Sequence, residues 1–370
     1  MSPVADLPAP DQVAGAAHPR DAARLIGQSA AEADFLEAFN RGRLHSGWLL
    51  TGPRGIGKAT FAYRAAAFLL AQTDGLALGP ATALGLSEDH PEMRLIRAGA
   101  HPRLAVIRRG PNDKGDKISA DIRVADIRKL KKFFHMSAAD GGQRVVIVDA
   151  ADEMNVSAAN AILKELEEPP ANTTLLLVSH QPSRLLPTIR SRCRSLRFAP
   201  LSPDDMAQVL AEADVTTTAP EALAVLAAGS AGRAIAMAQN DGLEIYAALI
   251  RLFEGLPKFD RPLAQKLAEA TAGRNGEARR DLTVELIGLF IARTAQAGLL
   301  GEPDRQGAPN EARLLTRLCP DTVAARIWAE LQIDLASRAR HALAVNLDPA
   351  ALIMDMFFRI EEAAKAAAAP

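Results

Sequence analysis

Hydrophobic and polar positions follow two different patterns along this 370-residue chain. Up to about residue 200, short apolar runs alternate with segments in which apolar residues recur at every third or fourth position. The short runs are typical of buried strands in a parallel sheet, and the longer repeats are typical of amphipathic helices. The expected strands are 45–52, 104–108, 144–150, 173–180 and 195–198. Strands that alternate with helices predict an α/β fold with a doubly wound parallel sheet.

After residue 200 only the helical pattern continues, so we expect a change of domain there. The sequence predicts a flexible N-terminus over 1–22, which is rich in Ala and Pro, and an α/β domain over 23–200. A small helical subdomain is expected over 201–243 and a separate helical domain over 244–365. No repeat of about 20–50 residues is visible, which argues against a solenoid.

Composition narrows the classes of function. Lys and Arg total 43 and Asp and Glu total 44, so a nucleic-acid contact must come from a local patch rather than from overall charge. Aromatic residues make up 4% of the chain, which disfavours binding by base stacking. Two cysteines cannot form a disulfide framework or an all-cysteine zinc site. We find no signal peptide and no apolar run of about 18 residues, so we expect a soluble, cytoplasmic protein that does not span a membrane.

A phosphate-binding loop motif occupies residues 52–60. Its residues are Gly52, Pro53, Arg54, Gly55, Ile56, Gly57, Lys58, Ala59 and Thr60. A glycine-rich turn between a strand and a helix directs backbone N–H groups towards phosphate oxygens, and Lys58 would reach the outer phosphates. The motif normally continues with Ser or Thr, whose hydroxyl ligates magnesium, but here Ala59 follows the lysine. Thr60 lies about 100° further around the helix. We therefore expect ATP or ADP binding with impaired placement of Mg²⁺.

A second acidic motif ends the expected strand at 144–150. Asp149 would hold magnesium, often through water. In hydrolysing ATPases of this kind, a Glu that orients the attacking water follows directly, whereas here the next residue is Ala150. We expect Asp152 and Glu153 to serve as charges or caps at the start of the next helix. Defects at two independent catalytic positions predict poor or absent ATP hydrolysis.

Further stretches carry a family resemblance: LIGQ at 25–28, LEEPP and IRSRC within 160–193, and GSAGRA at 229–234. Together with the loop region 42–58, they make the chain resemble the subunits of the bacterial DNA polymerase III clamp loader, which belong to the AAA+ class. The resemblance is dense over 24–240. It implies an AAA+ RecA-like sheet domain, a small helical lid and an all-helical collar domain.

The family contains two kinds of subunit, and the resemblance favours one of them. Motor subunits (gamma/tau) would carry Ser or Thr in place of Ala59 and Glu in place of Ala150, so the chain resembles the stator (delta-prime) type. Many members carry a four-cysteine zinc module before the second acidic motif. No cysteine precedes Cys193 in this chain, so no zinc is expected.

Three residues match positions with assigned roles in the family. Arg192 matches the arginine that reaches in trans into a neighbouring subunit's ATP site, and its alternative is an ion pair with Glu167 or Glu168. Ser179 matches a polar residue that senses the outer phosphate (sensor 1), and its alternative is a cap on the next turn. Arg233 matches a phosphate-contacting arginine of the lid (sensor 2), and its alternative is a solvated helix surface.

The resemblance also implies partners: motor subunits (gamma/tau), an opening subunit (delta), the sliding clamp and primed DNA contacted through its backbone, with no membrane. A basic segment at 123–134 places Arg128, Lys131 and Lys132 near one helix face, which would follow the DNA backbone or be a solvated surface. Three other functions stay open. They are an active AAA+ motor, a P-loop kinase and a scaffold that binds no nucleotide.

Overall fold

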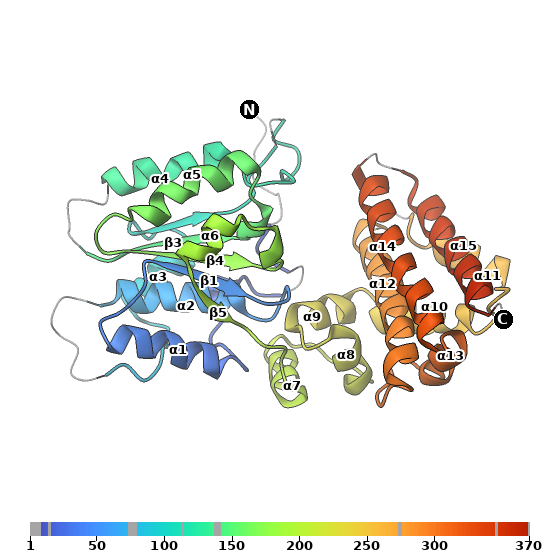
Figure 1. Ribbon diagram of the computed structural model, residues 1–370. Helices are drawn as coiled ribbons and strands as arrows, with labels where there is room; N and C mark the ends of the chain where they lie inside the picture. The colour runs from blue at the N-terminus through green and yellow to red at the C-terminus, as the bar shows by residue number, and fades with distance from the viewer. Residues whose placement is uncertain are drawn as a thin grey trace. The chain divides into compact units, whose positions relative to one another are not determined.

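The computed structural model describes residues 9–13, 16–72, 80–112, 114–136, 142–272, 276–344 and 347–368. The chain divides into two compact units. The first contains Met1–Ala213 and Gly229–Arg233, and the second contains Asp214–Ala228 and Ala234–Pro370. In Figure 1 the first unit is the blue-to-green α/β part of the chain. The division falls within the region 201–243, where the sequence pattern changes.

A parallel five-stranded sheet forms the centre of the first unit, in the order β2-β3-β4-β1-β5. Its strands are β1 (Gly47–Thr51), β2 (Leu104–Ile107), β3 (Arg144–Asp149), β4 (Thr173–Ser179) and β5 (Arg194–Arg197). Each one falls on an expected strand. Every residue of β3 and β4 is buried, as continuous apolar runs require when helices cover both faces of a sheet. The predicted α/β doubly wound fold is confirmed.

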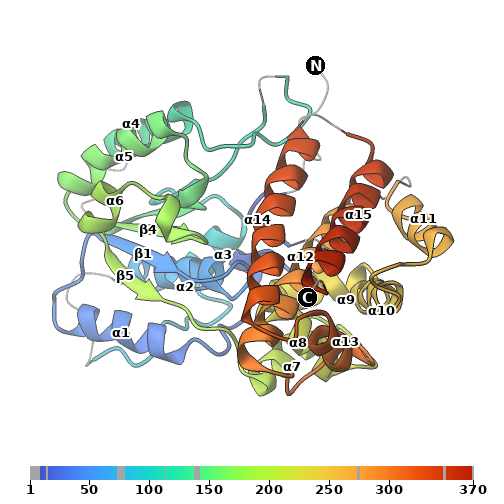
Figure 2. The same ribbon diagram turned by 45° about the vertical axis from the view of Figure 1, so that its right-hand side comes forward.

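Helices cover both faces of this sheet (Figures 1 and 2). One face carries α1 (Ser29–Asn40), α2 (Lys58–Leu70) and α3 (Pro91–Arg97). The other carries α4 (Val124–Met136), α5 (Val156–Glu167) and α6 (Pro187–Arg192). The alternation of side chains along β3 divides the core, since Val145 and Ile147 pack in the first layer and Val146 and Val148 in the second. The helix α7 (Pro203–Glu212) follows β5.

Helices are the only regular secondary structure in the described residues of the second unit. They are α8 (Pro220–Ala227), α9 (Ala231–Gln239), α10 (Gly242–Phe253), α11 (Arg261–Glu269), α12 (Gly276–Leu300), α13 (Glu311–Leu318), α14 (Thr322–Ala344) and α15 (Pro349–Ala367). The first three residues of α9 belong to the first unit. A buried carboxylate joins three of them: Glu311 accepts hydrogen bonds from Tyr246 Oη (2.5 Å) and Arg293 Nε (2.6 Å). These partners allow a charge to be buried in a helical core.

One helix corrects an expectation from the sequence. Residues Ala278–Leu300 of α12 are long and apolar enough to cross a membrane by length and composition, although we expected no such segment. Leu286, Ile287 and Phe290 in this helix are completely buried, and Phe290 packs against Trp328 of α14. These contacts make α12 a core helix of the second unit.

Candidate nucleotide site

The phosphate-binding loop joins β1 to α2 at the carboxyl edge of the sheet. The φ angles of Gly52, Gly55 and Gly57 are 147°, 78° and 99°, which residues other than glycine rarely adopt. A Cβ added to Gly52 would also lie 2.7 Å from the carbonyl oxygen of Phe198. The loop therefore requires glycine where the motif supplies it.

Lys58 is folded over this loop and is 2% exposed. Its Nζ donates hydrogen bonds to the carbonyl oxygens of Gly52 (2.7 Å) and Pro53 (2.5 Å). Burial lowers the pKa of Lys58 to about 8, and the charges of Asp149 and Asp152 offset part of this effect. The lysine thus lies among the groups that would surround phosphate oxygens.

The residues present fit a nucleotide phosphate better than they fit magnesium. Ala59 supplies no hydroxyl oxygen beside Lys58, and Ala150, 3% exposed, supplies no carboxylate after β3. Burial raises the pKa of Asp149 to about 7, the charge of Asp11 raises it further and the charge of Lys58 opposes both. A carboxyl group whose pKa is raised binds a divalent cation less readily, because the cation must displace its proton.

The two acids after β3 have roles other than the expected ones. The N-cap of α5 is Asn155, whose side chain accepts from the backbone N–H of Ala158. Asp152 instead accepts from the backbone N–H groups of His180 (2.9 Å) and of the residue after it (3.1 Å). Glu153 forms an ion pair with Arg109 (2.8 Å). Both contacts join segments that are distant in the sequence, so helix-start patterns do not indicate them.

Ser179 lies at the end of β4 and is completely buried. Among the described residues, neither its Oγ nor His180 Nδ1 has a hydrogen-bond partner. Ser179 does not cap the following turn, because Asp152 accepts those N–H groups. Burial lowers the pKa of His180 to about 4, and the charge of Lys58 lowers it further, so His180 belongs to the same edge of the sheet. Buried polar atoms of this kind call for an additional partner.

Residues 229–233 lie against the loop. Gly232 donates its backbone N–H to the Gly55 carbonyl oxygen (2.9 Å), and Ser230 Oγ donates to the Arg54 carbonyl oxygen (2.8 Å). The backbone N–H of Arg233 donates to Ser230 Oγ (3.2 Å). The segment GSAGRA therefore meets the phosphate-binding loop, and Arg233 is the next residue after this contact.

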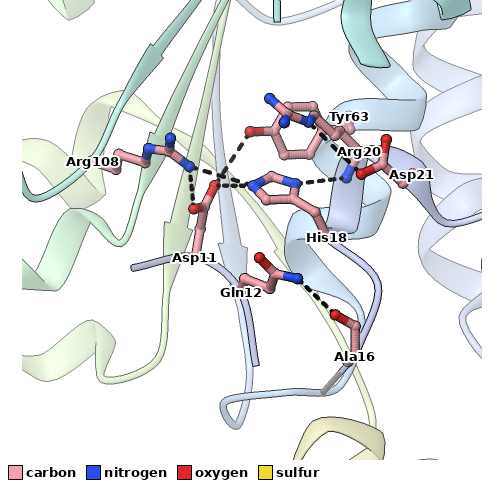
Figure 3. Close-up of polar contacts among 8 residues, drawn as sticks. All are labelled: Asp11, Gln12, Ala16, His18, Arg20, Asp21, Tyr63 and Arg108. Carbon is pink, nitrogen blue, oxygen red and sulfur yellow. Dashed lines mark hydrogen bonds and ion pairs between the residues drawn. The ribbon is translucent and has the colours of Figure 1, made fainter. Parts of the chain in front are cut away.

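A cluster that sequence reasoning missed joins the N-terminal residues to α2 and to the residue that follows β2 (Figure 3). Asp11 has a fully buried side chain and forms ion pairs with Arg108 and with His18 Nε2 (3.2 Å). Tyr63 Oη, from α2, donates to the same carboxylate (3.3 Å). Burial by itself would raise the pKa of Asp11, but the hydrogen bond from His18 and the charge of Arg108 outweigh it and lower the pKa to about 2. No sequence signal indicates this cluster, since Arg108 is 97 positions away from Asp11.

Arg192 is the last residue of α6 and does not join the cluster around the loop. Its Nη2 forms an ion pair with Glu167 Oε1 (2.6 Å), and its Nη1 donates to the Thr188 carbonyl oxygen (3.1 Å). The ion pair is therefore the one that the sequence offered as an alternative. The Arg192 side chain is 35% exposed and that of Glu167 is 48% exposed, so the pair is a surface contact worth about 0.2–1 kcal/mol.

Two other expectations concern DNA and zinc. On α4, Arg128, Lys131 and Lys132 are exposed, while Ile127 and Leu130 are buried against the sheet. The basic residues therefore form an outer face of the first unit. Within the described ranges, no group of three or more His, Cys, Asp or Glu side chains could hold a metal ion. Residues 73–79, which lie between the phosphate-binding loop and β3, are outside those ranges.

Comparison with known proteins gives the following matches. Residues 27–202 match the family described as "DNA polymerase III, delta subunit". A "DNA polymerase III subunit delta'" of Pseudomonas aeruginosa is 46% identical over 146 residues, which cover 40% of this chain and 40% of the relative. The Bacillus subtilis protein of the same name is 33% identical over 220 residues, covering 59% of this chain and 62% of the relative. A "DNA polymerase III subunit gamma/tau" of Mycobacterium bovis is 30% identical over 200 residues, covering 52% and 31%. The chain thus spans less than two thirds of the length of each of these relatives.

Proposed function

We propose that this chain, which is homologous to the delta' subunits of DNA polymerase III through residues 27–202, is a stator subunit of a clamp loader. In this role it helps motor subunits (gamma/tau), driven by their ATP, to place a sliding clamp on primed DNA in the cytoplasm. The observation that carries the proposal is a phosphate-binding loop complete in its backbone but flanked by Ala59 and Ala150. The same two residues argue against an active motor.

Arg192 is the group that the stator would supply to a neighbouring subunit. A permanently charged, planar guanidinium stabilises the charge that develops on a transferring phosphoryl group. Its exposure and the low cost of leaving Glu167 support this role, because a triphosphate attracts the guanidinium more strongly than a solvated carboxylate does. The residues of the loop, with Asp149, Ser179 and Arg233, would at most bind ADP or ATP with poorly placed magnesium.

The remaining partners follow from the same role. The opening subunit (delta) would contact the chain, and the basic face of α4 would meet the phosphate backbone of DNA without reading its sequence. Such a contact would weaken steeply with salt, since each neutralised phosphate releases counterions.

The test uses the complex rebuilt with motor subunits, opening subunit, clamp and primed DNA. Arg192→Ala should lower steady-state ATP turnover by at least about tenfold. Arg190→Ala, which removes another exposed arginine of α6, should leave turnover unchanged. Both variants must first be shown to assemble equally.

Two results would contradict the proposal. Equal ATP turnover in the Arg192→Ala and wild-type complexes would show that Arg192 does not act on a neighbouring subunit's ATP site. Steady ATP hydrolysis by the isolated chain would show that it is a motor instead.

A further inference from the structure

The described residues at the N-terminus, 9–13 and 16–21, lie beside the phosphate-binding loop, and we call them the N-terminal strap. Val13 packs near Gly55 of the loop and Gly232. A Cβ added to Gly232 would lie 3.0 Å from Val13 Cγ2 and 3.0 Å from Gly55 Cα, so the three residues pack together. Gly55 is at the tip of the loop, where backbone N–H groups would meet phosphate oxygens.

Asp11, two residues earlier, anchors the strap to other parts of the first unit (Figure 3). Its carboxylate forms an ion pair with Arg108, which follows β2, and accepts a hydrogen bond from Tyr63 on α2. It also pairs with His18, which belongs to the strap itself. The side chain of Asp11 is 0% exposed. An unpaired buried carboxylate is strongly unfavourable, so these contacts form together and hold the strap in one place. Residues 11–13 therefore run from the tip of the loop to the end of β2.

Charged groups at the carboxyl edge of the sheet are already engaged within the chain. After burial, the charge of Asp11 is the largest influence that raises the pKa of Asp149, the last residue of β3. Ala59 removes the hydroxyl that would bring a cation between Asp149 and a nucleotide. Lys58 already has two partners within the loop. An entering phosphate would thus meet a lysine that is already bonded within the loop.

We propose that the N-terminal strap closes the phosphate-binding loop in cis. Asp11, which anchors the strap, controls whether a nucleotide, ADP or ATP, can enter. This inference rests on the proposed function only in taking residues 52–60 as the nucleotide site. It makes no use of Arg192.

The test measures binding of a fluorescent N-methylanthraniloyl ADP to the isolated full-length chain by anisotropy. Asp11→Ala, and separately removal of residues 1–22, should increase the affinity at least about tenfold over wild type. Asp21→Ala is the matched control, since Asp21 is an exposed acid of the same strap. It should leave the affinity unchanged.

A third variant separates release of the strap from simple gain of positive charge. Asp11→Ala frees Arg108, whose guanidinium would itself attract phosphate. Arg108→Ala breaks the same anchor without leaving that charge, so it should also increase the affinity. If Asp11→Ala binds ADP more tightly and Arg108→Ala does not, the freed arginine explains the gain and the proposal is wrong.

The wild-type chain tests the proposal even where a variant fails to fold. Wild type should bind the ADP probe at least about tenfold more weakly than unmodified motor subunits do under the same conditions. Equal affinity would overturn the inference whatever the variants do. This result would leave the role of Arg192 untouched, because that role is measured by turnover of the complex. Conversely, loss of the Arg192 effect would not change the binding measured here.

Discussion

The two regions that carry the chemistry of this chain are built in opposite ways. Around the phosphate-binding loop, two charged groups are buried and paired within the chain. Lys58 bonds to carbonyl oxygens of its own loop, and the carboxylate of Asp11 is surrounded by its partners. Arg192, by contrast, ends a short helix at the surface and is held by one ion pair and one carbonyl oxygen.

This difference indicates which region is fixed and which is free to act. A buried charge that loses its partner costs several kcal/mol, whereas an exposed ion pair changes partner for about 0.2–1 kcal/mol. The loop region therefore behaves as rigid support, and the Arg192 side chain can change partner at low cost. The proposed role as a stator would need this combination, because a stator must hold its shape while it contributes one group in trans.

Asp11→Ala should produce the largest effect on stability. The substitution leaves Arg108 and Tyr63 without their shared partner, and we expect the free energy of unfolding to fall by about 2–3 kcal/mol. Urea denaturation of the isolated chain measures this change. Asp21→Ala should alter it by less than about 0.5 kcal/mol. An equally small effect of Asp11→Ala would mean that the two regions are not held differently.

Arg192→Lys tests the other region. Lysine keeps the positive charge but cannot meet two phosphate oxygens with a planar fork, so turnover of the rebuilt complex should still fall at least about tenfold. The stability of the isolated chain should change by less than about 0.5 kcal/mol, because the residue is exposed. Arg190→Lys serves as the control in both measurements. Full turnover with Arg192→Lys would show that charge alone suffices.

The pH dependence of stability should report Asp11 directly. Its pKa is lowered from 3.8 to about 2 in the folded chain, so its stabilising contribution is complete above the unfolded pKa and is lost as the pH falls towards 2. The difference in unfolding free energy between wild type and Asp11→Asn should therefore shrink by about 1 kcal/mol between pH 5 and pH 3. If the difference stays constant over this range, the carboxylate of Asp11 is not held by His18 and Arg108 in the folded chain.

The sequence predicted the elements whose signals are local. Each strand of the sheet stands out as a continuous apolar run, and the glycines of the loop are needed where their spacing places them. The seven residues of α3, PEMRLIR, are too few to establish a helical period, so the pattern of apolar residues alone does not indicate this helix.

The parts of the site that the sequence did not predict depend on distant contacts. Asp152 looks like a helix-start acid, but its partners are the N–H groups after β4, 28 and 29 positions away. Asp11 stands in a segment rich in Ala and Pro that suggests a flexible end, and only the fold brings Arg108 to it. Such pairings follow from the sheet order, which local patterns do not contain.

Glu167→Gln should give the smallest effect and is the finest test of the contrast between the two regions. In the isolated chain Glu167 holds one nitrogen of the Arg192 guanidinium, so it should orient the arginine before a neighbour arrives. An exposed ion pair is worth at most about 1 kcal/mol, which limits the loss of turnover in the complex to about fivefold. Glu168→Gln alters the adjacent exposed acid and should have no effect. In an Arg192→Ala background, Glu167→Gln should also have no effect, because the group that it orients is gone. A loss that persists there would mean that Glu167 acts on turnover by another route.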